Sequence, residues 1–499
     1  MRKADISFFD SVAEKRIEEI RKSADNLEIK GKIYYVSNSG NDENDGLSPE
    51  NAWKTLGKVS NAELSFGDGV LFCRGDLFRG SVKTREGVTY GAYGEGEKPK
   101  IYGWDRALDD PALWSEVDTA AHIWKWGERI PDPGTLVFGD DEAWSRKLIP
   151  SYINGRFVCR NDESKCFVMA EEMIEDLDMY WHYEERLTSQ TTTEDDSLVP
   201  LIDHQSLGEL YLRCDAGNPA EIFHKIEALT HRPVFVVGKN NNVCIDNVCI
   251  KYVGHHAICA GGHVKGLHVT NCEIGWIGGT IQHYYGTDPN YPEGGRGTVT
   301  RFGNGIEIYG GCEDYLVQNC YIYQSYDAGV THQITTAGKK TVMEGVRYLD
   351  NVIERCVYAI EYFLDMTEGD EQSYMRDIVM SGNILRLSGY GWGQQRHNFH
   401  TPAHIKGWSY TNRASDYHIH DNIFDRAAYR MLHLVAREKE SLPEMSSNTY
   451  VQTMGGMLGQ YGENKEKEPP ILTYGEDAEA CIRDIFGDSD ATVLFVENK

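Results

Sequence analysis

The sequence predicts an all-β fold, a right-handed parallel β-helix in which short strands stack coil upon coil. The 499 residues include 50 Gly and only 15 Pro, a balance that favours many tight turns between strands. From residue 236 an imperfect repeat of roughly two dozen residues appears, which is typical of a solenoid. Within each copy apolar residues occur at alternate positions, and this period of two indicates strands and not helices.

Residues 1–31 predict an amphipathic helix, at roughly residues 5–25, ahead of the first strand. Apolar side chains recur along it among alternating acidic and basic residues: Ile6, Phe8, Phe9, Val12, Ile17 and Ile20. A solenoid has open ends with unpaired strand edges, so we expect this helix to cap one of them.

Residues 32–103 predict the first coils, because short β-rich runs (IYYVS, GVLFCRG and VTYGAYG) alternate with Gly, Asp and Asn turns. Residues 104–235 are less regular and predict an excursion that packs against the side of the solenoid. Its tryptophans are expected to form a core more than a sugar-stacking surface: Trp114, Trp124, Trp126, Trp144 and Trp181.

Residues 236–440 predict the main part of the β-helix, in which one Asn recurs after the same strand of each copy. The copies are Asn247, Asn271, Asn319, Asn351, Asn383 and Asn422. Asn tolerates left-handed backbone geometry in turns, and stacked copies would form a ladder of side-chain amides. We therefore interpret these residues as structural. Residues 441–499 are expected to close the solenoid with a final strand, ATVLFV.

Two other repeat folds fit less well. A leucine-rich repeat needs helical segments, and a propeller needs four strands per unit and a longer period. Several motifs of the first coils match many β-helix proteins that act on carbohydrate: Gly40, Asn41, Asp42, Gly46, Trp53-Lys54-Thr55-Leu56, Gly67-Asp68, Arg74-Gly75-Asp76 and Tyr93-Gly94. Over residues 32–103 and 236–435 the chain resembles the pectate-lyase-like superfamily, and the resemblance implies a carbohydrate-active protein of the glycoside-hydrolase type.

A second strand follows each recurring Asn, and alternation decides which of its side chains face outward. In GIEI the isoleucines face the core and Glu307 faces outward; the same parity turns Glu361 outward in AIEY and Asp327 in DAGVTHQ. Matching GIEI with AIEY puts Glu307 and Glu361 in one column, two coils and roughly 10 Å apart, with Asp327 on the coil between. If the copies are aligned on the recurring Asn instead of on these two motifs, the register shifts by two residues. The sequence leaves both alignments open.

Three carboxylates gathered on one face of a chain with a formal charge of −27 predict glycoside hydrolysis. That reaction needs a carboxylic acid to protonate the leaving oxygen and a carboxylate to attack or to activate water. We therefore predict a glycosidase with Asp327, Glu361 and Glu307 as catalytic residues. The alternative is that these outward acids are merely solvated.

Two long insertions, before Glu307 and after Asn383, predict a substrate pocket, because loops of this length in a compact fold are usually functional. Aromatic rings stack on sugar faces, and polar neighbours bind hydroxyls. The predicted substrate-binding residues are His332, Gln333, Asp365, His255, Arg301, Tyr284, Trp392, His400 and Trp408. The alternative is that the aromatic rings pack the loops on themselves.

No metal and no cofactor are predicted for a hydrolase, although a lyase would call for calcium. His397, His400 and His404 have ligand-like spacing but lie in a Gly-rich loop. His255 and His256 are adjacent, so in a strand they would point to opposite faces.

The expected partner is an oligosaccharide. The acidic charge argues against nucleic acid and, more weakly, against a polyanionic substrate. The sequence contains no apolar run that would span a membrane, and self-association is left open. Scattered Cys residues, several in apolar strands, and the lack of an apolar leader predict a cytoplasmic protein. Polymers do not enter cells, which favours exo-cleavage of imported oligosaccharides.

Two other functions remain open. A polysaccharide lyase or uronate epimerase on the same scaffold would need a basic residue, for which Arg430 is the main candidate. The other strand positions of this face are interpreted as acidic or aromatic. A non-catalytic carbohydrate-binding solenoid is the third interpretation, and long loops over an acid-bearing strand argue against it.

Overall fold

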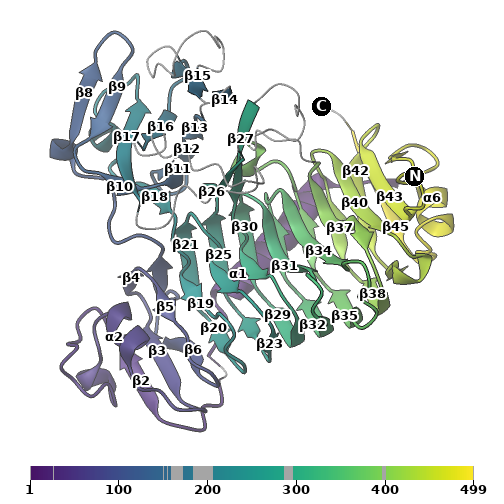
Figure 1. The fold of residues 1–499 in the computed structure, drawn as a ribbon, viewed down its shortest axis with the longest axis horizontal. Coiled ribbons are helices and arrows are strands. Elements are labelled where there is room, and N and C mark those ends of the chain that lie inside the picture. Colours follow the sequence, from purple (N-terminus) through teal and green to yellow (C-terminus); the bar gives the residue numbers. More distant parts are fainter. Residues whose placement is uncertain are drawn as a thin grey trace.

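The computed structural model describes residues 2–25, 27–149, 151–153, 156–158, 172–183, 206–285, 296–395 and 401–497. The chain winds into a right-handed parallel β-helix, as predicted, and three long sheets form its walls (Figure 1). We call them sheets I, II and III, in the order in which each coil passes through them. Neighbouring coils pair almost entirely in parallel, so each coil adds one strand to each wall.

Sheet I opens each coil and has 11 strands. They are β2 (Ile33–Val36), β3 (Gly69–Cys73), β6 (Thr89–Tyr93), β20 (Cys244–Asp246), β23 (Val264–Lys265), β24 (His268–Thr270), β29 (Cys312–Gln318), β32 (Val342–Leu349), β35 (Tyr374–Ser381), β38 (Ala414–His420) and β41 (Glu444–Ser446).

Sheet II has 14 strands. They are β1 (Arg2–Lys3), β4 (Leu77–Arg79), β7 (Lys100–Tyr102), β11 (Pro133–Phe138), β12 (Ala143–Trp144), β18 (Ile226–Thr230), β21 (Cys249–Val253), β25 (Glu273–Ile277), β30 (Tyr321–Ser325), β33 (Val352–Glu354), β36 (Ile384–Arg386), β39 (Ile423–Asp425), β42 (Thr449–Thr453) and β45 (Thr492–Val496).

Sheet III carries the candidate site and has 10 strands. They are β5 (Val82–Lys83), β19 (Phe235–Val236), β22 (Ile258–Ala260), β28 (Ile306–Ile308), β31 (Ala328–Thr335), β34 (Tyr358–Asp365), β37 (Ala403–Thr411), β40 (Arg430–Ala436), β43 (Met457–Glu463) and β44 (Leu472–Thr473).

The interior of the solenoid is a continuous apolar core, because the inward residues of all three sheets meet there. The ten cysteines in the described residues are all free thiols, and Cys249, Cys320 and Cys356 are buried as predicted. Cys259 is only partly buried, because it faces outward from β22.

The predicted Asn ladder exists, and it runs through the later coils. The side-chain amide of Asn351 donates to Asn383 at 2.9 Å, Asn383 donates to Asn422 at 2.9 Å, and Asn422 donates to Asn448 at 3.0 Å. Asn448 then donates to Asp488, which ends the ladder. Each buried amide is thus satisfied by the next coil, as a buried polar group requires.

In the earlier copies the Asn itself occupies the turn position, and the side-chain amide of Asn319 still donates to Asn271 at 2.6 Å. Asn247, Asn271 and Asn319 have φ values of 59°, 55° and 53°, the left-handed geometry that the turn position needs. In the coil of Asn351 that geometry belongs to Asp350, with φ 58°, and the Asn follows it into the core. The recurring Asn therefore occupies one of two adjacent positions: the turn residue itself in the earlier copies, or the residue after it in the coil of Asn351.

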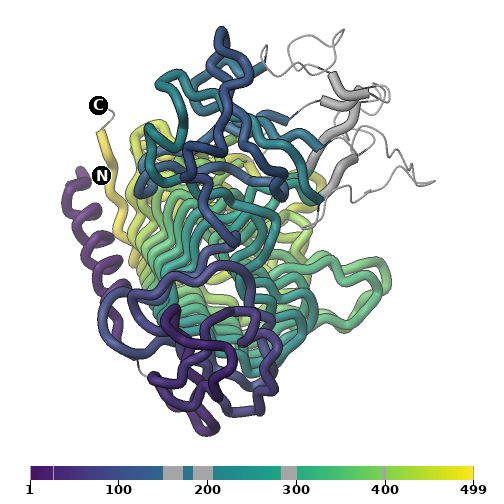
Figure 2. Tube along the Cα trace, turned by 90° about the vertical axis from the view of Figure 1, so that its left-hand side faces the viewer, coloured from purple at the N-terminus to yellow at the C-terminus, as the bar shows by residue number. Residues whose placement is uncertain are grey.

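The predicted N-terminal helix is α1 (Ile6–Arg21), but it does not cap the solenoid. Ala13 and Ile20 pack on the outer face of sheet II, against Tyr321 and Tyr323, and Figure 2 shows the helix beside the stacked coils. The prediction was wrong because a single apolar face is buried equally well on the aromatic outer surface of a sheet.

The C-terminal end is covered instead by α6 (Ala478–Asp484), whose Ala478 and Ile482 enter the main core. The other helical segments are α2 (Leu56–Asn61), α5 (Pro219–Phe223), η1 (Pro49–Asn51), η2 (Pro111–Leu113), η3 (Trp392–Gln395) and η4 (Lys439–Ser441). Among the helices of the described residues, none has both the length and the apolar character needed to cross a membrane.

The excursion leaves the solenoid between two coils that stack directly on each other, since β7 pairs with β21 and β5 with β19. Its six-stranded sheet holds β8 (Trp114–Asp118), β9 (Ile123–Trp126), β10 (Ile130–Pro131), β13 (Arg146–Lys147), β16 (Asp178–His182) and β17 (Leu207–Arg213). Trp114, Trp126 and Trp181 lie in its apolar core, as expected.

The insertion before Glu307 forms a hairpin, β26 (Thr280–Tyr285) and β27 (Arg296–Phe302), where a loop was expected. It joins β14 (Ser151–Ile153) and β15 (Arg156–Val158) in a four-stranded sheet. At its base Gly303, with φ 134°, lies so close to Gly278 that a Cβ would be 2.1 Å from the Gly278 Cα. This contact fixes where β28, and with it Glu307, begins.

Candidate active site

One column of outward side chains crosses sheet III, with one residue from each of seven successive coils. The strand register aligns Cys259, Glu307, Thr331, Glu361, Lys406, His433 and Gln460. We call this the polar column. Glu307 and Glu361 therefore share a column two coils apart, as matching GIEI with AIEY predicted, and the count from the Asn is excluded.

Aromatic rings form a second column beside the first, two residues further along the same strands. It contains Tyr309, Phe363 and Trp408, and Tyr410 follows Trp408. The Tyr309 and Phe363 rings are 6.4 Å apart, Phe363 and Tyr410 are 5.3 Å apart, and Trp408 stacks on Tyr410 at 5.8 Å. We call this the aromatic column.

Glu307 is buried, with 4% of its surface exposed, and within the described residues its hydrogen bonds come from neutral donors. Its carboxylate accepts from the Asn304 side chain at 2.7 Å, from the Thr331 hydroxyl at 2.5 Å and from the Gln333 amide at 3.1 Å. Gln333 keeps its own carbonyl oxygen buried without a partner in the described part of the chain. That oxygen is a ready acceptor for a ligand hydroxyl.

His256 lies near both Glu307 and Asp327, the third predicted acid. Burial lowers the pKa of His256, and the negative charges of Glu307 and Asp327 act in the opposite direction. Asp327 is half-buried in the turn before β31, and its carbonyl oxygen accepts the N–H groups of Val357 and Tyr358. Asp327 thus lies beside the polar column and not in it.

Glu361 is held by the aromatic column and lies next to a cation. The indole N–H of Trp408 donates to its carboxylate at 2.6 Å. Lys406, its neighbour in the polar column, lies with Nζ 4.0 Å from the centre of the Trp408 ring. Burial lowers the pKa of Lys406 to about 7, and the charge of Arg430 adds to the effect.

Beyond Lys406 the column continues with His433 and Gln460 and is covered by the chain that follows β43. His433 and Gln460 both contact the carboxylate of Glu468, each at 3.3 Å. The contact with His433 lowers the pKa of Glu468 to about 2, while burial lowers the pKa of His433 to about 4. The Arg430 guanidinium is also buried here and donates to Gln460.

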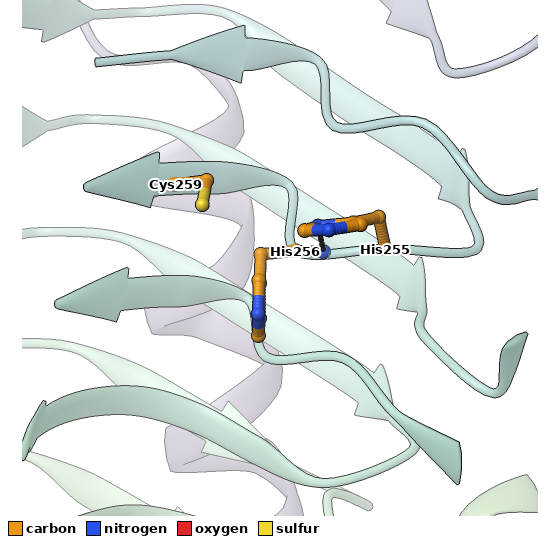
Figure 3. A group of neighbouring side chains, drawn as sticks. All are labelled: His255, His256 and Cys259. Carbon is orange, nitrogen blue, oxygen red and sulfur yellow. Dashed lines mark hydrogen bonds between the residues drawn. The ribbon is translucent and has the colours of Figure 1, made fainter. Parts of the chain in front are cut away.

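A cluster of metal-ligand types lies at the other end of the column. Ring nitrogens of His255 and His256 and the sulfur of Cys259 lie within 4.8 Å of one another (Figure 3). The two histidines lie in the turn before β22, so they converge where a strand would have separated them.

The tautomers of this cluster oppose metal binding. Nδ1 of His255 accepts the His256 N–H at 2.7 Å, and Nδ1 of His256 accepts the Asn304 N–H at 3.0 Å. Each neutral ring therefore carries its proton on Nε2, which leaves no lone pair there for a metal. Burial also raises the pKa of the Cys259 thiol to about 12. The arrangement instead makes His256 a hydrogen-bond donor.

Three of the predicted substrate-binding residues are structural. His332 is fully buried inside the coil, where it contacts the Tyr348 hydroxyl at 2.9 Å. Arg301 is buried and donates to the carbonyl oxygens of Gly279 and Gly134. Trp392 is buried against Tyr326. These predictions were wrong because they rested on residue type alone. Strand alternation turns His332 inward, and packing between segments buries Arg301 and Trp392.

The other predicted residues have different positions. Gln333 and Trp408 contact the two column acids directly, as described above. His255 lies beside His256, and Asp365 lies at the end of β34, 3.7 Å from Arg437. The side chain of Tyr284 and the whole of His400 lie outside the described residues.

Several residues of the site were missed by the sequence analysis: Asn304, His256, Tyr309, Phe363, Lys406 and His433. The signal for Lys406 was present, because the inward Ile405 precedes it and Gly407, which pairs with the inward Tyr362 and Leu434, follows it. That stretch was interpreted as the end of a loop, which hid the fifth member of the polar column.

Searches with protein-family models and against curated protein sequences find no match for this chain. Among solved structures it is similar to XylC in complex with xylose, at 10% identity over 93% of this chain and 83% of that one, with a TM-score of 0.40. It is also similar to the GH136 lacto-N-biosidase of Eubacterium ramulus, at 11% identity over 98% and 70%, with a TM-score of 0.36. A family 28 exopolygalacturonase of Yersinia enterocolitica matches at 10% identity over 85% and 66%, with a TM-score of 0.34.

The paired sheets themselves define the class of this protein, the right-handed parallel β-helix, which the repeat and the motifs of the first coils predicted. The features of this particular chain that bear on its function are the polar and aromatic columns.

Proposed function

We propose that the protein is a glycoside hydrolase whose active site is the polar column of sheet III. The observation that carries this proposal is the shared column of Glu307 and Glu361, two coils apart and beside a row of aromatic rings. Two carboxyl groups on one face are the minimum for acid–base cleavage of a glycosidic bond. Rings such as Tyr309, which is 46% exposed, supply the surface on which a sugar stacks.

The surroundings of the two acids support different roles. Glu361 lies beside the Lys406 ammonium, and a neighbouring cation favours the carboxylate form, so we assign it the role of base. The partners of Glu307 in the described part of the chain are neutral groups, and we assign it the role of proton donor. Asp327 and His256 flank Glu307 and are assigned to positioning it and the substrate.

The spacing of the two acids favours inversion. Two coil spacings place their backbones roughly 9.6 Å apart, and because both side chains leave the same face, their carboxyl groups are expected at a separation much nearer to this value than to about 5 Å. Inverting glycosidases hold their carboxyl groups about 6.5–9.5 Å apart, whereas retaining enzymes hold them about 5 Å apart. Thr331 lies between the two acids in the column, and water above it would lie within reach of Glu361.

The test compares Glu307→Gln and Glu361→Gln with Glu368→Gln, an exposed acid in the turn after β34. On a panel of aryl glycosides and oligosaccharides, each column variant should lose at least 10²-fold in kcat, the usual contribution of a general acid or base. The control should keep full activity, and circular dichroism should confirm that all three fold. Full activity in both column variants would refute the assignment.

A second candidate is a lyase acting on uronate polymers, and Lys406 is the observation that favours it. A buried lysine with a pKa of about 7 can take up a proton at neutral pH, which is what β-elimination requires. Elimination would be recognised by the ultraviolet absorbance of an unsaturated product, which hydrolysis does not form.

A further inference from the structure

The basic end of the polar column contains two buried cationic groups with unused donors. Lys406 is 3% exposed, and the described residues offer its ammonium no hydrogen bond and no ion pair, only the face of Trp408. Arg430 is 4% exposed and uses its terminal nitrogens on Gln460 and Thr401, while its Nε has no partner in the described part of the chain. A buried donor without a partner destabilises the protein, so a ligand that accepts from it is favoured.

The nearby acids do not accept hydrogen bonds from Lys406 or Arg430 in the described part of the chain. Glu468 is engaged by His433 and Gln460, and Glu361 by Trp408. Each acts on Lys406 only at a distance, because none of the described ion pairs includes Lys406 or Arg430. In a chain with a formal charge of −27, two buried cations without a directly contacting anion are exceptional.

We infer that this end of the polar column binds an oxyanion substituent of the substrate, a carboxylate or a sulfate, on the sugar next to the bond that is cleaved. The inference rests on the proposed function of the same face. Lys406 and Arg430 would donate to the anion, and His433, whose Nδ1 is buried without a partner among the described residues, would accept a neighbouring hydroxyl.

The register decides which sugar carries the charge. Lys406 follows Glu361 directly in the column, at one strand spacing of about 4.8 Å. That is about the width of one sugar ring, so the anion belongs to the sugar held at Glu361 and not to a distant unit. The overall negative charge of the protein, which argued against acidic substrates, is offset at this end of the polar column by Lys406 and Arg430.

The experiment uses pairs of aryl glycosides that differ only at C6, as the hydroxymethyl, the carboxylate or the 6-sulfate. For the full chain, the acidic member should have the higher kcat/KM, and the carboxylate and sulfate arms show which anion is selected. Arg430→Gln and Lys406→Met should each lower the ratio of kcat/KM for the acidic substrate to kcat/KM for the neutral one. We expect a decrease of at least tenfold, which corresponds to the loss of one charge-assisted hydrogen bond. Lys83→Met, an exposed lysine on β5 of the same sheet, is the matched control and should leave the ratio unchanged.

Binding separates the two proposals if no aryl glycoside is cleaved. Calorimetric titration with galacturonate, glucuronate and glucose 6-sulfate, against galactose and glucose, should show anion-dependent binding that Arg430→Gln weakens at least tenfold. Equal binding of acidic and neutral sugars, or an acidic preference that survives both substitutions, would overturn the inference while leaving the hydrolase proposal intact. Anion-selective binding without hydrolysis would sustain the inference and refute the hydrolase.

Discussion

Replacing Lys406 by Met should stabilise the protein, although Lys406 lies in the candidate site. The side chain is 3% exposed and contacts the face of Trp408, with Nζ 4.0 Å from the ring centre. Burial lowers its pKa from 10.5 to about 7. Met has nearly the same length and fills the same space without a charge, so the substitution removes the cost of burial and keeps most of the packing.

The magnitude follows from the pKa. One pKa unit corresponds to about 1.4 kcal/mol, so keeping this lysine protonated in the folded state costs about 5 kcal/mol. The contact between the ammonium and the indole acts on the charged form, so it is already included in this cost. We therefore expect Lys406→Met to raise the free energy of unfolding by about 5 kcal/mol wherever the lysine would be charged.

The pH dependence identifies the cause. The folded-state pKa is below the unfolded-state value, so the unfolded chain binds the extra proton between about pH 7 and pH 10.5. In this window the stability of the wild-type protein should rise with pH, and below it the full cost remains. The variant should lack this rise, so its advantage should be largest near pH 6 and vanish near pH 10.5.

Urea unfolding at about pH 6 and about pH 10, followed by circular dichroism, measures both effects. Lys83→Met is the control, because Lys83 is exposed on the same sheet and should change stability little at either pH. A Lys406→Met variant that is less stable than the wild type near pH 6, or that keeps the same rise with pH, would show that the lysine is not buried as a charge.

Four further outcomes are expected. Asn383→Ala should lower the free energy of unfolding by about 1–3 kcal/mol, because it removes the acceptor of the Asn351 amide inside the core; equilibrium unfolding measures it. Ile20→Asp should detach α1 from sheet II, seen as fast hydrogen exchange at residues 6–21 while sheet III stays protected. Nuclear magnetic resonance of the first product should show an inverted anomeric centre, and retention would contradict the spacing of the two acids. The preference for acidic substrates should fall as the pH rises through about 7, where Lys406 loses its charge, and a preference that is independent of pH would exclude Lys406 as its source.

Strand parity was the most reliable guide to the site. Alternation alone turned Glu307 and Glu361 outward and, through their shared motif, placed them in one column, because in a strand the side-chain direction is set by position and not by context. The same rule would have excluded His332, which follows Thr331 and therefore points into the core.

In loops, position in the sequence does not determine the direction of a side chain. Arg301 and Trp392 have the chemistry of ligand-binding residues, yet both are buried where the excursion and the η3 turn pack on the solenoid. His255 and His256 converge because the chain turns there, which a strand assignment could not foresee. Which loop residues face a cleft depends on contacts between segments far apart in the chain.

The sequence by itself determined the coil, its apolar interior, the structural role of the Asn residues and the outward direction of two acids, because each depends on residues a few positions apart. Only the tertiary structure decided that Lys406 follows Glu361, that aromatic rings line the polar column and that α1 lies on sheet II. The order of residues in the columns depends on the length of each inserted loop, because that length sets the register in which the next strand pairs with the preceding coil. That register is set by packing between coils, and no local pattern encodes it.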